Sequence, residues 1–299
     1  MLTPFTEEGC IDFKGLETLT EFYIASGASG LFTNCLSGEM FQLSPEERIS
    51  LTGAVVRFAA DRVPVVSTGT FSKNIKKNVD FISRISDLGV ACTVVNTNQI
   101  CEVSDREDVF FSQLEKLIEA SGTMALGIYE CPVPYKRLLS NNLIAWLANS
   151  GRFSYFKDTC CDNEQIRARL SVSENSPLGL YNAHTPSGLQ SLRDGAAGLS
   201  PIGANFYPEL YSYLYSHAGL EETPEFEQVK DFLSFNDPVL HTLYPYSAKF
   251  FLQSRGLPLS TYIRTYIPKA QDEEIIRLHK LLTKMEEIFE TANMKNECR

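Results

Sequence analysis

The sequence has few of the residues and spacings that build metal sites. Its eight cysteines include no C-x-x-C pair, and its four histidines, His184, His217, His241 and His279, are far apart in the chain. A structural zinc site needs thiolate or imidazole ligands in closely spaced pairs, so we expect no metal site. We interpret the cysteines as reduced, apolar thiols of a cytoplasmic protein.

Long apolar runs and an excess of basic residues are also absent. No stretch of about 18 apolar residues occurs, so no transmembrane helix is predicted. The opening MLTPFTEEG carries acidic residues in place of the basic start of a secretory signal. The 27 Lys and Arg are outnumbered by 37 Asp and Glu, which gives a net charge of −10. This balance argues against nucleic-acid partners and against anionic membrane surfaces, because both require clustered positive charge.

Short apolar runs alternate with helical patterns over most of the chain. The runs are continuously apolar, which is typical of strands in a parallel sheet covered on both faces. Ser44-Pro45-Glu46-Glu47 combines an N-cap, a proline at the first helical position and a capping-box glutamate, so a helix should begin there. Strands are expected at 2–5, 30–33, 64–68, 92–96, 124–129, 153–157, 178–181 and 198–200. Helices are expected at 12–26, 45–60, 74–88, 105–121, 140–149, 162–172, 186–194 and 205–217.

Eight strand–helix units in succession predict a (β/α)8 TIM barrel, a simpler solution than two doubly wound domains. We expect residues 1–220 to form this barrel as the catalytic domain. The strand pattern then stops, and helices are expected at 224–235, 238–255 and 271–292. Residues 221–299 are therefore predicted to be a C-terminal helical extension.

Strand ends are the first places to look for chemistry, because barrel enzymes carry their reacting groups there. Lys157 ends an aromatic-rich strand, where poor hydration would lower the pKa and leave a neutral amine able to form a Schiff base. By position alone, a lysine that reaches solvent or pairs with Asp158 is the stronger alternative. Tyr129 ends the preceding expected strand and could transfer a proton, or it could simply anchor the core.

Two loops offer further candidates. Ser37 and Gly38 could place a hydroxyl and backbone N–H groups around a carboxylate, while Glu39 is expected to satisfy backbone donors of its own loop. His184 follows the expected strand at 178–181 and could bind a substrate hydroxyl or act as an acid or base. The alternative for His184 is a loop residue with a backbone partner.

Taken in order along the chain, these short elements form a recognisable combination. T-P-F lies near the start, S-G-E is followed by L-S-P-E-E-R, and Y-x-x-P, F-K-D and G-A-x-G with A-N come later. The combination resembles the dihydrodipicolinate synthase / N-acetylneuraminate lyase family, from Leu2 to nearly the end of the chain. The resemblance implies a (β/α)8 barrel with a helical extension and Schiff-base chemistry on pyruvate or another 2-oxo acid. It also implies a homo-oligomer, a dimer or tetramer, and a reaction that needs neither a metal nor an organic cofactor.

The resemblance assigns roles to single residues. Lys157 matches the Schiff-base lysine, and Tyr129 matches the tyrosine of a Y-N-x-P motif that transfers protons and binds the substrate carboxylate. Glu130 replaces the asparagine of that motif. Ser37 matches the second of two adjacent hydroxyl residues that hold the 2-oxo-acid carboxylate, and Leu36 stands in the place of the first.

Departures from the family pattern narrow the activity. Pro134 stands where dihydrodipicolinate synthases have an arginine, and the segment 96–100, with Asn98 and Gln99, lacks the tyrosine of the family's proton relay. Thr159 matches a threonine of the sugar-acid lyases, but the segment around His184 does not reproduce their acidic hydroxyl-binding pair. Ser200 matches a position near the Schiff base that is usually aliphatic. Neither the lysine-biosynthesis reaction nor cleavage of sialic acid is therefore expected.

The sequence predicts a lyase or aldolase that cleaves or forms the C3–C4 bond of a 2-oxo-3-deoxy sugar acid or a similar 2-oxo acid. Two alternatives stay open: a dehydratase of a 4-hydroxy sugar acid that uses the same imine, and a non-catalytic 2-oxo-acid sensor. A metal-dependent barrel aldolase is a weaker rival. Family members have several residues before the T-P-F element, so we also expect the natural chain to begin upstream of Met1.

Overall fold

The computed structural model describes residues 1–268 and 272–292. The chain forms two compact units. The sheet unit comprises Phe32–Leu36 and Pro64–Ser200. The helical unit comprises Met1–Leu31, Ser37–Val63 and Pro201–Arg299. The N-terminal and C-terminal parts of the chain therefore belong to the same unit.

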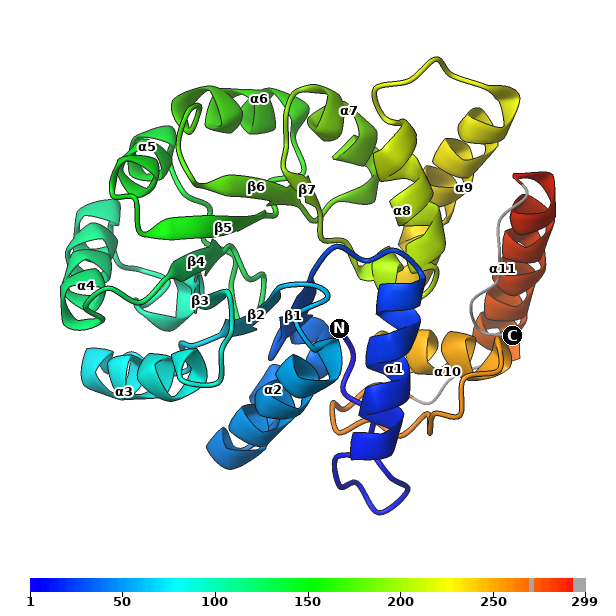
Figure 1. The fold of residues 1–299 in the computed structure, drawn as a ribbon, viewed down its shortest axis with the longest axis horizontal. Coiled ribbons are helices and arrows are strands. Elements are labelled where there is room, and N and C mark those ends of the chain that lie inside the picture. The colour runs from blue at the N-terminus through cyan, green and yellow to red at the C-terminus, as the bar shows by residue number, and fades with distance from the viewer. Residues whose placement is uncertain (269–271, 293–299) are drawn as a thin grey trace. The chain divides into compact units, whose positions relative to one another are not determined.

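The sheet has seven strands in sequence order, each beside the next along the chain (Figure 1). Parallel pairing runs from the second strand to the seventh. The strands are short and mostly buried, as their continuous apolar runs predict. They are β1 (Leu31–Thr33), β2 (Val65–Thr68), β3 (Cys92–Asn96), β4 (Leu126–Tyr129), β5 (Phe153–Asp158), β6 (Gly179–Asn182) and β7 (Gly198–Leu199).

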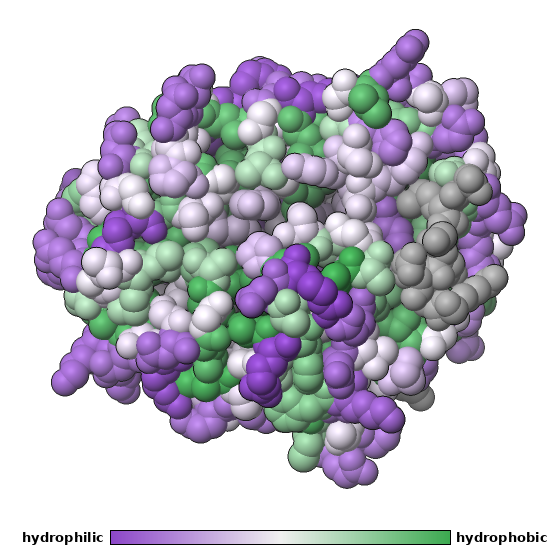
Figure 2. Space-filling model, viewed as in Figure 1, coloured by the Kyte–Doolittle hydropathy of each residue, from purple (hydrophilic) through white to green (hydrophobic). Residues whose placement is uncertain are grey.

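The five helices α3 to α7 connect β2 to β7 in succession and lie along the outer side of the sheet in Figure 1. Alternate strand residues such as Ile128 and Phe156 share one buried cluster with helix residues such as Leu114 and Leu147. Figure 2 shows mainly hydrophilic residues over the outward faces of α3, α4 and α6, as amphipathic helices require. The helices are α3 (Ile75–Ser86), α4 (Glu107–Ala120), α5 (Asn141–Asn149), α6 (Asn163–Val172) and α7 (Gly188–Arg193).

The helical unit holds α1 and α2 together with the helices that follow the sheet. The capping box predicted for α2 is present: the Ser44 N–H donates to Glu47 Oε2 at 2.8 Å, and the Glu47 N–H donates to Ser44 Oγ at 3.2 Å. The helices are α1 (Phe13–Ala25), α2 (Pro45–Ala59), α8 (Pro208–His217), α9 (Pro224–Leu240), α10 (Tyr246–Ser254) and α11 (Asp272–Thr291). Among the described residues, no helix is both long and apolar enough to cross a membrane.

Two expected elements are wrong. The segment 2–5 forms no strand, and within it only Phe5 takes part in an isolated antiparallel bridge, to Ile11. Its apolar residues are buried, but Pro4 has no N–H to give to a sheet. The predicted helix break before Pro238 is also wrong, because α9 continues to Leu240. Pro238 removes a single N–H from the last turn, and the break comes later, where Leu243 has a left-handed φ of 57°.

Candidate active site

The ends of three neighbouring strands bring Lys157 between two tyrosines. The parallel register pairs Lys157 with Tyr129 on one side and with Tyr181 on the other. Successive strand residues point to opposite faces, and the preceding residues, Ile128 and Phe156, belong to the cluster shared with the helices. The side chains of Tyr129, Lys157 and Tyr181 therefore lie on the face of the sheet away from those helices.

The amine of Lys157 lies in an apolar, aromatic setting. Its Nζ is 5.0 Å from the centroid of the Tyr129 ring and 5.6 Å from that of Phe32, and the residue is 8% exposed. Burial lowers the pKa of Lys157, while the nearby thiols of Cys35 and Cys131 oppose that shift. A larger fraction of this amine is therefore neutral and nucleophilic than of a solvated lysine.

Aromatic rings form the wall around this amine. Phe32 makes edge contacts with Tyr129 and Tyr155 at centroid distances of 5.8 and 5.7 Å, and Tyr155 packs on Tyr181 at 4.7 Å. Sequence reasoning missed Phe32 and Tyr155 as site residues. The period of two was the available signal for Tyr155, because it precedes Lys157 by two positions on β5 and so shares its face.

Tyr129 is placed to hold a proton beside the amine. The side chain is 4% exposed, and burial raises the pKa of Tyr129 well above its usual value. The nearby Cys131 thiol contributes to the same shift. The phenol therefore stays protonated and can donate its proton to an oxygen that develops negative charge nearby.

The other predicted site residues have their own partners. The Thr159 hydroxyl donates to the Glu130 carbonyl at 2.8 Å, and Ser200 Oγ accepts from the Tyr155 hydroxyl at 3.2 Å. The Nδ1 of His184, which is half-buried, lies 2.9 Å from Ser187 Oγ.

Leu36 and Ser37 lie on a short 3₁₀ turn, Leu36–Gly38, where the chain passes from the sheet unit to the helical unit. Ser37 is buried and Leu36 is half-buried. Contact of these residues with a substrate stays a prediction, as it does for Thr159, His184 and Ser200.

The family of the chain follows from comparison with known proteins. The model of the dihydrodipicolinate synthetase family matches residues 1–285. The chain belongs to this family. It is a family of class I aldolases, which use a lysine Schiff base.

Relatives and solved structures in the dihydrodipicolinate synthetase family align with nearly the whole chain. The 4-hydroxy-tetrahydrodipicolinate synthase of Bacillus velezensis is 23% identical over 92% of this chain and 94% of its own length. A dihydrodipicolinate synthase from Acinetobacter baumannii, solved in complex with pyruvate, has a TM-score of 0.85, is 20% identical and covers 96% of this chain and 97% of its own. A prophage protein of the family from E. coli K12, also in complex with pyruvate, has a TM-score of 0.82 at 20% identity and covers 96% of each chain. The predicted fold class, a TIM barrel with a C-terminal helical extension, is confirmed, with seven strands in the described sheet where the sequence predicted eight.

Asn98 lies in the segment 96–100, where this sequence lacks the tyrosine that the family resemblance leads us to expect. Its side-chain nitrogen donates to the carbonyls of Cys131, Val133 and Tyr135 at 2.7, 2.8 and 2.8 Å. The residue is fully buried. Asn98 therefore holds the loop that follows β4.

Glu39 corrects one expectation about the S-G-E loop. Its carboxylate accepts hydrogen bonds from the backbone N–H groups of Arg264 and Thr265, both at 2.7 Å, and from Lys249 Nζ at 3.0 Å. The backbone donors come from a segment more than 200 residues away instead of from its own loop. A sequence pattern within the loop cannot show donors that only the fold brings near.

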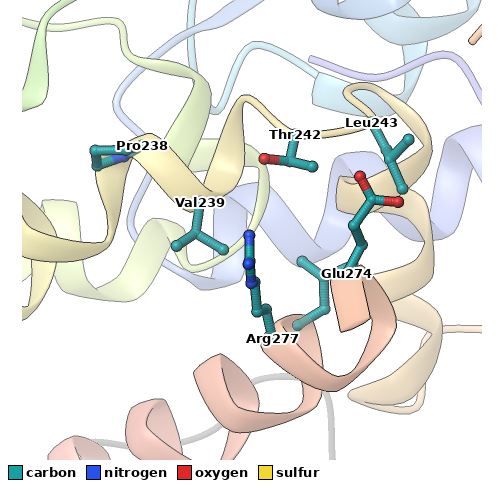
Figure 3. A pocket seen from close by; sticks show the side chains of 7 residues that line it. Pro238, Val239, Thr242, Leu243, Glu274 and Arg277 are labelled. Carbon is teal, nitrogen blue, oxygen red and sulfur yellow. The ribbon is translucent and has the colours of Figure 1, made fainter. Parts of the chain in front are cut away.

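In the described part of the chain, candidate metal ligands and the pocket in Figure 3 contribute no residue to the site around Lys157. In residues 1–268 and 272–292, no group of three or more His, Cys, Asp or Glu side chains is placed to hold a metal. No disulfide joins the seven described cysteines to one another, and Cys298 lies outside the described residues. The pocket in Figure 3 contains none of the predicted site residues and is lined by Pro238, Val239, Thr242, Leu243, Glu274, Arg277 and Leu278.

Proposed function

We propose that this protein is a Schiff-base lyase or aldolase that acts on pyruvate or another 2-oxo acid. The observation that carries the proposal is the buried amine of Lys157, with its lowered pKa, beside the protonated Tyr129. Membership in a class I aldolase family supports it, as do the pyruvate complexes of the two related proteins.

The chemistry follows from these two side chains. The neutral amine of Lys157 adds to the keto carbon, and Tyr129 donates a proton to the carbinolamine oxygen, which leaves as water. The protonated imine then withdraws electrons. The phenolate left on Tyr129 takes the proton of the C4 hydroxyl, the C3–C4 bond breaks, the aldehyde leaves and an enamine remains. Protonation of the enamine at C3 and hydrolysis of the imine release pyruvate and regenerate the amine. Condensation runs through the same steps in reverse.

The substrate class is a 2-oxo-3-deoxy sugar acid or a similar 2-oxo acid. We propose that Ser37 and backbone N–H groups near Leu36 hold its carboxylate, and that Thr159, His184 and Ser200 contact the rest. Pro134 stands where the lysine-biosynthesis enzymes have an arginine, and the segment 96–100, with Asn98 and Gln99, lacks the tyrosine of their proton relay. We therefore do not propose their reaction. We propose a cytoplasmic homo-oligomer, a dimer or tetramer, without a metal or an organic cofactor.

A non-catalytic 2-oxo-acid sensor is the second candidate. Leu36 stands in the place of the first carboxylate-binding hydroxyl, and the side-chain nitrogen of Asn98 donates to three loop carbonyls. A sensor would form the imine but release no product. A dehydratase would form the imine and release water from C4 without releasing pyruvate.

Borohydride trapping tests the imine. The protein is incubated with pyruvate, reduced with borohydride, and analysed by intact and peptide mass spectrometry. We expect one adduct on Lys157, none in Lys157→Met, and a wild-type level in Lys116→Met, a control lysine exposed on α4. A panel of 2-oxo-3-deoxy sugar acids is then screened for released pyruvate. If none of the 2-oxo acids tested gives an adduct, both the lyase and the dehydratase are rejected.

A further inference from the structure

Two carboxylates directly follow the proposed catalytic residues. Glu130 comes after Tyr129, and Asp158 comes after Lys157. Because strand residues alternate between faces, both carboxylates point to the face opposite the amine. There they meet Arg169 of α6, and all three side chains are at most 2% exposed.

The Glu130 carboxylate joins the two strand ends to a loop and a helix. Its Oε1 accepts from the Leu139 N–H at 2.7 Å and forms an ion pair with Arg169 Nη2 at 3.0 Å. Its Oε2 accepts from the Thr159 N–H at 3.1 Å and from Arg169 Nη1 at 3.1 Å. One side chain therefore ties together the end of β4, the residues after β5, and the loop before α5.

Asp158 and Arg169 complete this cluster. Asp158 accepts from Arg169 Nη1 through Oδ2 and from the Cys160 N–H through Oδ1 at 2.9 Å. Arg169 also donates to the Leu139 carbonyl at 3.1 Å. One cation thus serves two buried carboxylates, an arrangement that stabilises a fold no better than well-packed apolar residues would.

We propose that Glu130, held by Arg169 and Asp158, is a positioning residue that keeps Tyr129 and Lys157 facing each other at the ends of β4 and β5. The inference rests on the proposed function, because it assigns the two positioned side chains to imine formation. Glu130 itself touches neither the amine nor the phenol, and it acts through the backbone on either side of them.

The cluster also has a built-in sensitivity to pH. The charged and titratable groups that face Glu130 are Arg169 and Asp158, with the Cys160 thiol beside them. Burial raises the pKa of Glu130 to about 7. All four groups that bond its two oxygens are N–H donors, so a proton on either oxygen displaces at least one of them. Acidification through pH 7 therefore weakens the contacts by which Glu130 holds the strand ends.

Glu130→Gln tests the proposal because it keeps the shape and removes the charge and two acceptor positions. At pH 8 we expect pyruvate to be trapped on Lys157 about tenfold more slowly, since the loss of one such hydrogen bond is worth about a factor of ten. The protection factors of the Leu139 and Thr159 amides in hydrogen exchange should fall by a similar factor. In the wild type these protection factors should fall between pH 8 and pH 6, whereas in Glu130→Gln they should stay level.

Glu209→Gln is the matched control. Glu209 also forms a buried ion pair, with Arg255, but in the helical unit. The Glu209→Gln variant should leave the hydrogen exchange of the Leu139 and Thr159 amides unchanged. Arg169→Lys, which keeps the charge but not the paired N–H groups, provides the same readouts if Glu130→Gln does not fold. Wild-type trapping rates and protection factors in the Glu130 and Arg169 variants would overturn the inference. If the wild type traps no 2-oxo acid, the proposed function fails, and the protection factors alone decide whether Glu130 holds the strand ends.

Discussion

At the scale of single residues, the reactivity of this chain depends on where water is excluded. Lys157 and Tyr129 are both buried, but burial acts on them in opposite directions because it always disfavours the charged form. The pKa of the amine is lowered and that of the phenol is raised. In the proposed mechanism, the amine is thereby prepared to attack a carbonyl, and the phenol keeps the proton that the departing water needs.

Tyr129→Phe removes that proton while keeping the ring. We expect the rate of imine formation to fall by about 10²–10⁴-fold, the usual contribution of a positioned acid or base. The adduct on Lys157 should still form at long times, because the amine is unchanged. Stopped-flow or quenched borohydride trapping measures the rate, and Tyr246→Phe on α10 is the control. A rate within twofold of the wild type would show that Tyr129 does not transfer the proton.

At the scale of elements, the start of α2 shows how a local signal gains a distant partner. Ser44 and Glu47 form the capping box that their spacing predicts. Arg264, far along the chain, donates to both carboxylate oxygens of Glu47, at 2.9 and 2.6 Å. These bonds lower the pKa of Glu47 to about 2. The helix start therefore also anchors the segment that follows α10.

Glu47→Gln should cost stability in a pH-dependent way. The pKa of Glu47 is lower in the folded protein than its ordinary value of 4.5, so its stabilisation is present above pH 4.5 and lost as the pH falls toward 2. We expect a loss of about 1–2 kcal/mol at pH 7 and a smaller one at pH 3, because the pair is partly exposed. Urea unfolding of wild type and variant at both pH values measures this. Glu46→Gln on the same turn is the control, and a loss independent of pH would contradict the explanation.

At the scale of the whole molecule, the helical unit is assembled from three separate stretches of chain. A buried cluster joins all three: Glu39 from the middle stretch binds Lys249 from the last, and Lys249 Nζ lies 4.5 Å from the ring centroid of Phe5 in the first. Both charged side chains are at most 1% exposed. Burial lowers the pKa of Lys249 to about 8, with Glu39 opposing the shift.

Lys249→Met should destabilise the protein by about 3–5 kcal/mol, because it leaves the carboxylate of Glu39 buried without its cation. Adding Glu39→Gln should recover part of that loss, since the unpaired charge is then removed. The free energy of unfolding in urea at pH 7 measures both variants. A single variant within 1 kcal/mol of the wild type, or a double variant that is less stable than the single one, would show that the pair does not hold the three stretches together.

The sequence by itself determined the parallel strands, most of the helices, and the positions of Lys157 and Tyr129 at strand ends. These features are local, because apolar runs, caps and strand termini depend on residues that are close together in the sequence. Only the tertiary structure decided which side chains meet. The ring contacts of Phe32, the Glu130–Arg169 ion pair and the distant donors to Glu39 depend on strand register and on contacts between remote segments. Periodicity reports that a residue is buried, whereas its partner is set by the packing of the whole chain.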